Sequence, residues 1–157
     1  MHIHFVCTGN AYRSRLAEAY LRSHQLEGVI VSSSGIQART GFQYNGPISW
    51  YAMRLLQKHH LIPFMSKHAT QTTRKGLGKV HLVIFMQPHH YEWVRTHYQF
   101  EAPRYEIWGI PDVSETEEDL NTEAALIQIT EKTFEQIKRN VELLVEQIRL
   151  AAPVEVR

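Results

Sequence analysis

The sequence contains one cysteine, Cys7, among 157 residues. A single cysteine excludes an internal disulfide bond and any zinc site built from several cysteines. No apolar run is long enough to cross a membrane, and the first residues turn polar too soon for a signal peptide. Neither positive nor negative charge predominates: the formal net charge is +1, and the basic residues are scattered along the sequence. These absences predict a cytoplasmic protein with no membrane or nucleic-acid partner.

The length favours one domain, residues 1–157, large enough to bury a core. Apolar periodicity predicts strands that alternate with helices. The expected strands are 2–6, 29–32, 80–86 and 105–108, and the expected helices are 13–24, 48–60, 88–97 and 121–151. This order indicates an α/β fold: a four-stranded parallel sheet flanked by helices on both faces. Ligands of such sheets bind beyond the carboxyl ends of the strands, which is where Cys7 is expected.

The cysteine begins a short segment with the spacing C-x5-R-S, in which Arg13 and Ser14 open the first expected helix. Backbone N–H groups at a helix N-terminus converge on one point and favour an anion there. Gly9 permits a tight turn, and the Arg13 guanidinium can clamp two oxygens of a phosphoryl group. The same positive field favours a thiolate, which is a nucleophile for covalent phosphoryl transfer. A lone cysteine after a strand is usually a small buried apolar residue, but this spacing favours the functional interpretation.

The segment resembles the phosphate-binding loop of the low-molecular-weight protein tyrosine phosphatases, whose pattern is C-x-G-N-x-C-R-S. The matching residues are Cys7, Gly9, Asn10, Arg13 and Ser14. Tyr12 stands where the family usually has a second cysteine. The resemblance continues through 31–38, 48–61 and 80–86 and indicates an atypical member of bacterial type. It implies a phosphomonoesterase of the protein-tyrosine-phosphatase type with a cysteinyl-phosphate intermediate. The implied phosphate-binding residues are Thr8, Gly9, Asn10, Ala11, Tyr12, Arg13 and Ser14.

The reaction also needs a proton donor, because expulsion of a bare alkoxide is slow. The segment WGIPDVSE offers Asp112, which matches the aspartate of the family's D-P motif with Val113 in place of proline. The resemblance implies that Asp112 protonates the leaving oxygen and then activates water. The alternative is a turn or capping residue before the acidic run 114–119. No metal or cofactor is expected, because Arg13 and the loop amides supply the positive field.

The resemblance further implies that Asn10, Ser14 and Ser33 brace the loop through hydrogen bonds, with ordinary turn or capping roles as an even alternative. The family's bracing histidine has no counterpart, since Lys67 aligns best and His68 lies one place off.

Several positions depart from the family and leave the substrate open. They are Gln87 in place of an aspartate, Ser114 and Glu115 where aromatic residues rim the pocket, and Arg39 where tryptophan is common. Three residues offer a replacement aromatic wall, namely Tyr12, Phe42 and Tyr44. Ala11 matches neither the threonine of the arginine-phosphatase branch nor the larger aliphatic residue of tyrosine-specific members.

Alternatives to the tyrosine-phosphatase interpretation are a protein-arginine phosphatase and a non-catalytic phosphate- or phosphopeptide-binding relative. An arsenate reductase is disfavoured because the thioredoxin-coupled kind needs further cysteines. The expected partner is a phosphorylated protein or a small phosphomonoester, and the oligomeric state is left open. The adjacent histidines at 59–60 and 89–90 resemble metal-ligand pairs, but a solvated surface position is the favoured interpretation.

Overall fold

A single parallel sheet forms the centre of the computed structural model, which describes residues 1–40, 46–102, 104–115 and 122–152. The strands are β1 (His2–Cys7), β2 (Ile30–Gly35), β3 (Leu82–Phe85) and β4 (Tyr105–Ile107). They are ordered β2-β1-β3-β4, and each neighbouring pair is parallel. Each strand expected from the sequence is therefore present, with its ends shifted by at most a few residues.

Helices connect the strands, as the alternating pattern predicts. The helices are α1 (Arg13–Ser23), α3 (Trp50–Lys58), α4 (Arg74–Leu77), α5 (Pro88–Tyr98) and α6 (Glu123–Ala151), with 3-10 turns η1 (Ile62–Phe64) and η2 (Val113–Glu115). The single-turn elements α4, η1 and η2 were not predicted, because one turn is too short to show helical periodicity. The expected start of α6, residue 121, lies outside the described residues.

The start of α3 differs from the prediction. We expect a helix from residue 48 with Pro47 at its first turn, whereas the first helical residue is Trp50. Ser49 is the cap, and its hydroxyl accepts a hydrogen bond from the Ala52 N–H at 3.2 Å. A serine cap satisfies an N–H group that the helix itself leaves unpaired, so it sets the boundary more strongly than the nearby proline.

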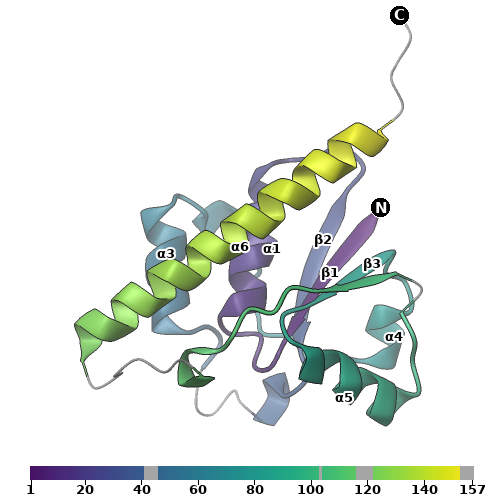
Figure 1. Cartoon of the computed structure of the whole chain (residues 1–157), viewed down its shortest axis with the longest axis horizontal. Helices are drawn as coiled ribbons and strands as arrows, with labels where there is room; N and C mark the ends of the chain where they lie inside the picture. The colour runs from purple at the N-terminus through teal and green to yellow at the C-terminus, as the bar shows by residue number, and fades with distance from the viewer. Residues whose placement is uncertain (41–45, 103, 116–121, 153–157) are drawn as a thin grey trace, which may run out of the picture.

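Helices cover both faces of the sheet, as Figure 1 shows: α1, α3 and α6 lie on one side, and α4 and α5 lie on the other. Alternate side chains of β1 point to opposite faces. Ile3 and Phe5 pack in the larger core cluster with α1, α3 and α6, whereas Val6 packs in the second cluster with residues of α4 and α5. The predicted architecture, with helices on both faces, is confirmed.

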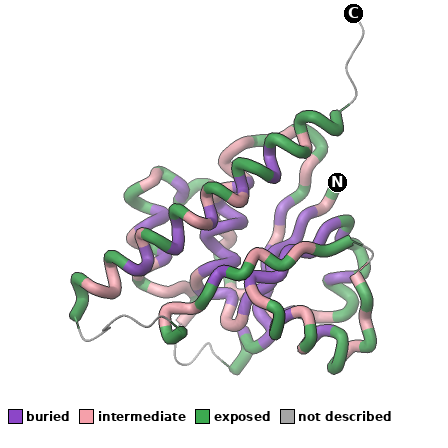
Figure 2. The backbone as a smooth tube through the Cα atoms, in the orientation of Figure 1, coloured by how far each residue is buried: buried purple, intermediate pink, exposed green. Residues whose placement is uncertain are grey.

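Burial follows this layering. The middle strands are buried along most of their length, whereas α6 alternates between a buried and an exposed face (Figure 2). Within the described ranges, we find no helix with the length and apolar character that crossing a membrane requires. Because all strands are parallel, their carboxyl ends meet at one edge, and the loops that follow β1, β3 and β4 come together there.

Candidate active site

A small cavity lies at the carboxyl edge of the sheet, next to the loop that joins β1 to α1. Its volume is about 70 Å³, and its lining residues are Cys7, Gly9, Ala11, Tyr12, Arg13, Ser49 and Asp112. The structure thus brings together the predicted nucleophile, arginine and acid, although Asp112 is far from Cys7 in the sequence. Thr8 and Asn10 in the loop, and Ser14 in the first turn of α1, do not line the cavity.

The loop rests directly on the end of β2. A Cβ atom at Gly35 would lie 2.5 Å from the Asn10 nitrogen and 2.5 Å from the Thr8 carbonyl oxygen. Real Cβ atoms do not approach backbone this closely, so a glycine is required where the strand meets the loop. Asn10 itself has a φ of 51°, in the left-handed region that asparagine tolerates better than most residues.

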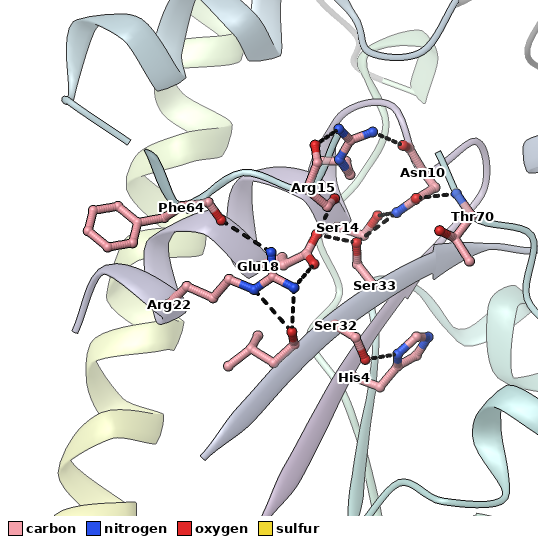
Figure 3. A network of polar contacts seen from close by, with 12 residues as sticks. His4, Asn10, Ser14, Arg15, Glu18, Arg22, Ser32, Ser33, Phe64 and Thr70 are labelled. Atoms are coloured by element: carbon pink, nitrogen blue, oxygen red, sulfur yellow. Dashed lines mark hydrogen bonds and ion pairs between the residues drawn. The ribbon is translucent and has the colours of Figure 1, made fainter. Parts of the chain in front are cut away.

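Asn10 is the centre of a chain of hydrogen bonds with Ser14, Ser33 and Thr70 (Figure 3). Its Oδ1 accepts from the Thr70 N–H at 2.8 Å, so its Nδ2 is the donor to Ser14 Oγ at 2.8 Å. Ser14 Oγ thereby accepts from Asn10, and its own proton is free to point at Cys7 Sγ, 2.9 Å away. The Asn10 N–H also donates to that sulfur at 3.3 Å.

The second Nδ2 proton of Asn10 is directed, through Ser33, toward a buried carboxylate. Asn10 Nδ2 donates to Ser33 Oγ at 2.9 Å, and Ser33 donates to Glu18 Oε2 at 2.6 Å. Glu18 is 1% exposed, accepts a hydrogen bond from the Ser66 hydroxyl at 2.9 Å and forms an ion pair with Arg22 at 2.8 Å. A charge buried this deeply is tolerated because it is paired and hydrogen-bonded.

Lys67 and His68, the two residues closest to the family's bracing histidine, are both exposed. The Thr70 N–H and the Ser66 hydroxyl, from the same segment, make the hydrogen bonds to Asn10 and Glu18. Sequence reasoning missed Glu18. The only hint in the sequence is that Glu18 is an acidic residue close to Ala17 and Leu21, which belong to the apolar face of α1.

Arg15 supports the loop from behind. Its side chain is buried, and its guanidinium donates to the carbonyl oxygens of Asn10 at 3.2 Å, Pro47 at 2.8 Å and Ser66 at 2.5 Å. This arginine therefore fastens the loop backbone to the segments before α3 and after η1. It was not predicted, because its charge suggests a solvent-facing residue.

Arg13 is held from three sides at the cavity. One terminal nitrogen donates to Gln87 Oε1 at 2.5 Å and to the Ile110 carbonyl at 2.8 Å. The other lies 3.4 Å from Thr8 Oγ1 and 3.6 Å from Asp112 Oδ2. The guanidinium is 3% exposed, so its orientation is fixed before any ligand arrives.

His90 corrects the prediction that the paired histidines lie on the surface: it is fully buried, although His89 is exposed. Its Nδ1 accepts from the Gln87 N–H at 3.1 Å, so the other nitrogen carries the proton and donates to Thr8 Oγ1 at 2.8 Å. Burial and the nearby Arg13 charge lower the pKa of His90 to about 3. His90 is therefore a neutral support for the cradle. In the described parts of the chain, no group of three side chains is placed to hold a metal ion.

Asp112 lies at the mouth of the cavity, with a side chain that is 39% exposed. Its Oδ1 accepts from the Val113 N–H at 2.8 Å, and its carbonyl accepts from the Glu115 N–H at 3.0 Å. Asp112 thus immediately precedes η2 and also faces Arg13, so one residue occupies both the turn position and the cavity position. Arg39 is exposed, and the two other expected aromatic residues, at 42 and 44, lie outside the described residues.

A parallel sheet whose first strand ends in an anion cradle with a thiol, an arginine and a carboxyl group defines an α/β domain built to bind a phosphoryl group. Residues 2–153 match the model of the low molecular weight phosphotyrosine protein phosphatase family. The chain belongs to this family, so it is a phosphatase, a hydrolase of phosphorylated substrates. The resemblance found in the loop sequence is confirmed.

Solved structures share the fold. The low molecular weight protein tyrosine phosphatase from T. tengcongensis is 25% identical, with a TM-score of 0.73 over 94% of this chain and 99% of that chain. YfkJ from Bacillus subtilis is 23% identical, with a TM-score of 0.74 over 98% and 97%. The YwlE arginine phosphatase from Geobacillus stearothermophilus is 22% identical, with a TM-score of 0.70 over 95% and 93%. A comparison with curated proteins gave no match.

Proposed function

We propose that this phosphatase is of the protein-tyrosine-phosphatase type and works through a cysteinyl-phosphate intermediate. The observation that carries the proposal is the convergence of Cys7, Arg13 and Asp112 on one small cavity. The hydrogen bonds of Asn10 and Ser14 support it further, because the Ser14 hydroxyl and the Asn10 N–H are both directed at the sulfur.

In the first step, Cys7 Sγ attacks phosphorus and the bond from phosphorus to the leaving oxygen breaks. Arg13 and the loop N–H groups hold the equatorial oxygens while charge redistributes. Asp112 gives its proton to the leaving oxygen. In the second step, Asp112 takes a proton from water, the water oxygen attacks phosphorus, and the sulfur–phosphorus bond breaks. Inorganic phosphate is released and Cys7 returns to the thiolate.

An aryl phosphate is the substrate class we favour. Tyr12 lines the cavity with its half-buried ring, and Ala11 beside it adds little bulk. A flat aromatic wall suits the ring of phosphotyrosine. The T. tengcongensis relative is named a tyrosine phosphatase and the Geobacillus relative an arginine phosphatase, so both phosphoamino acids belong in the test.

The test measures hydrolysis of phosphotyrosine and phosphoarginine peptides by the parent enzyme and by Cys7→Ser. We expect phosphotyrosine to be preferred and the variant to lose at least about 10³-fold in kcat, as nucleophile removal typically does. Binding of phosphate, measured by NMR titration, should persist because Arg13 and the loop amides remain. Phosphate binding by a parent enzyme without turnover would instead identify a non-catalytic binding relative.

A further inference from the structure

Gln87 connects the arginine of the cradle to the turn that carries the acid. It lies between β3 and α5, and its amide reaches in two directions. Its Oε1 accepts from Arg13 at 2.5 Å, and its Nε2 donates to Glu115 Oε2. The orientation of this amide is fixed at both ends, because a guanidinium only donates and a carboxylate only accepts.

Glu115 is the last residue of η2, so holding it also holds the start of that turn. The Glu115 N–H donates to the Asp112 carbonyl at 3.0 Å, and the Val113 N–H donates to Asp112 Oδ1 at 2.8 Å. Arg13 already binds the Ile110 carbonyl just before the turn. The contact between Gln87 and Glu115 holds the last residue of η2. The chain is therefore anchored on both sides of Asp112, at Ile110 and at Glu115.

This contact also joins two departures from the family pattern. Gln87 stands where an aspartate is expected, and Glu115 stands where aromatic residues are expected. An aspartate at 87 would satisfy Arg13 but would set two carboxylates against each other. A neutral amide binds the guanidinium and the carboxylate together, so the two departures compensate each other.

We propose that Gln87 and Glu115 form a latch, and that both are positioning residues for Asp112. The latch holds the turn so that the Asp112 carboxyl faces the cavity beside Arg13. This inference rests on the proposed function, since it presumes that Asp112 is the general acid. It predicts that opening the latch slows proton donation without removing the cradle.

The test compares phenyl phosphate, a poor leaving group, with 4-nitrophenyl phosphate, a better one. Glu115→Ala should lower kcat/KM, which reports the step that releases the phenol, about tenfold for phenyl phosphate, a part of the 10²–10⁴-fold that a general acid supplies, and about twofold for 4-nitrophenyl phosphate. Glu115→Gln should stay close to the parent on both, because its amide oxygen still accepts from Gln87. Ser114→Ala, in the same exposed turn, is the matched control and should change neither.

A charge exchange sharpens the test. Gln87→Glu should open the latch by setting two carboxylates together, with the same selective loss on phenyl phosphate. Combining it with Glu115→Gln should restore the parent ratio, because one amide and one carboxylate again face each other. Equal losses on both esters, or a double variant no better than Gln87→Glu alone, would overturn the latch while leaving the proposed function intact. A parent enzyme that hydrolyses neither ester would overturn both proposals.

Discussion

The two sides of the cavity are built in opposite ways. Below the cradle lies a set of buried polar residues, which we call the floor: Asn10, Ser14, Glu18 and Ser33. Above it lies the rim, formed by Gln87, Asp112 and Glu115, whose residues are half-buried or exposed. In the floor each proton has one available direction, and no solvent competes for it. In the rim the central carboxyl group is open to water.

This difference matches the work that each side is proposed to do. Stabilising a thiolate and a bound anion requires dipoles that are already oriented, because reorientation during the reaction would cost free energy. The acid, by contrast, must gain and lose a proton in every cycle and must admit water to the phosphorus. A carboxyl group on an exposed turn meets that need. Breaking one side at a time should therefore give distinguishable kinetics.

The largest effect is expected from the rim. Asp112→Asn removes the proton donor but keeps the shape of the turn. Turnover of poor leaving groups should fall by about 10²–10⁴-fold, whereas good leaving groups, which depart without a proton, should be affected far less in the first step. The measurement is the burst of released phenol across a series of substituted phenyl phosphates. The same loss for every phenol would mean that another residue is the acid.

A substitution in the floor should give the opposite kinetic pattern, a loss of turnover that does not depend on the leaving group. Ser14→Ala removes the hydroxyl that lies 2.9 Å from Cys7 Sγ. The sulfur must leave as a thiolate when the intermediate hydrolyses, so that step should slow by about 10²-fold, as for a lost oxyanion donor. Because the phenol has already departed, steady-state turnover should fall equally for all substrates. Ser23→Ala, at the far end of α1, serves as control, and a loss that varies with the phenol would contradict this assignment.

A buried histidine, His4, lies close to the floor in the fold. His4 lies on the opposite face of the sheet and bonds Ser32 at 2.6 Å and Ser34 at 2.7 Å, the two residues that flank Ser33. Burial lowers the pKa of His4 from 6.5 to about 4. In the unfolded chain His4 gains a proton near pH 6.5, but in the folded chain it does so only near pH 4. The stability of the folded state is therefore lost as the pH falls between these two values.

Protonation of His4 should lower the free energy of unfolding by about 3 kcal/mol between pH 7 and pH 4. Each unit of difference between the folded and unfolded pKa of His4 contributes about 1.4 kcal/mol. Urea unfolding at pH 7, 6, 5 and 4 measures it. His4→Gln should be less stable at pH 7 but should show a shallower decline toward acid. An unchanged slope in that variant would show that His4 does not set the acid limit.

The contrast between floor and rim also explains what the sequence could predict. The cradle was predictable because it is local: Cys7, Gly9 and Arg13 occupy one short segment, and its placement after a strand follows from periodicity. Asp112 was reached through a family motif. Gln87 was seen only as a departure, because its partner Arg13 lies 74 residues away and its role depends on which loops meet at the sheet edge. His90 was misassigned since adjacent histidines look alike in sequence, although one faces the cradle and the other faces solvent.

The smallest expected effect concerns oxidation of the thiol. Peroxide converts a thiolate to a sulfenic acid with release of hydroxide, and further peroxide gives the sulfinic acid, which thiol reductants do not reverse. The sequence has no second cysteine to trap the sulfenic acid as an internal disulfide. Recovery of activity by dithiothreitol should therefore decline, by a few-fold, as exposure to peroxide lengthens.

Tyr12 lines the same cavity as Cys7, so Tyr12→Cys should supply the missing partner and make recovery independent of exposure time. Tyr12→Ser is the matched control, because it removes the ring without adding a thiol. Intact mass would show a gain of one oxygen and then two in the parent, and a loss of two hydrogens in Tyr12→Cys. Complete recovery of the parent at every exposure time, without an intermolecular or mixed disulfide, would contradict the prediction. Such recovery would mean that burial shields the sulfur from the second oxidation.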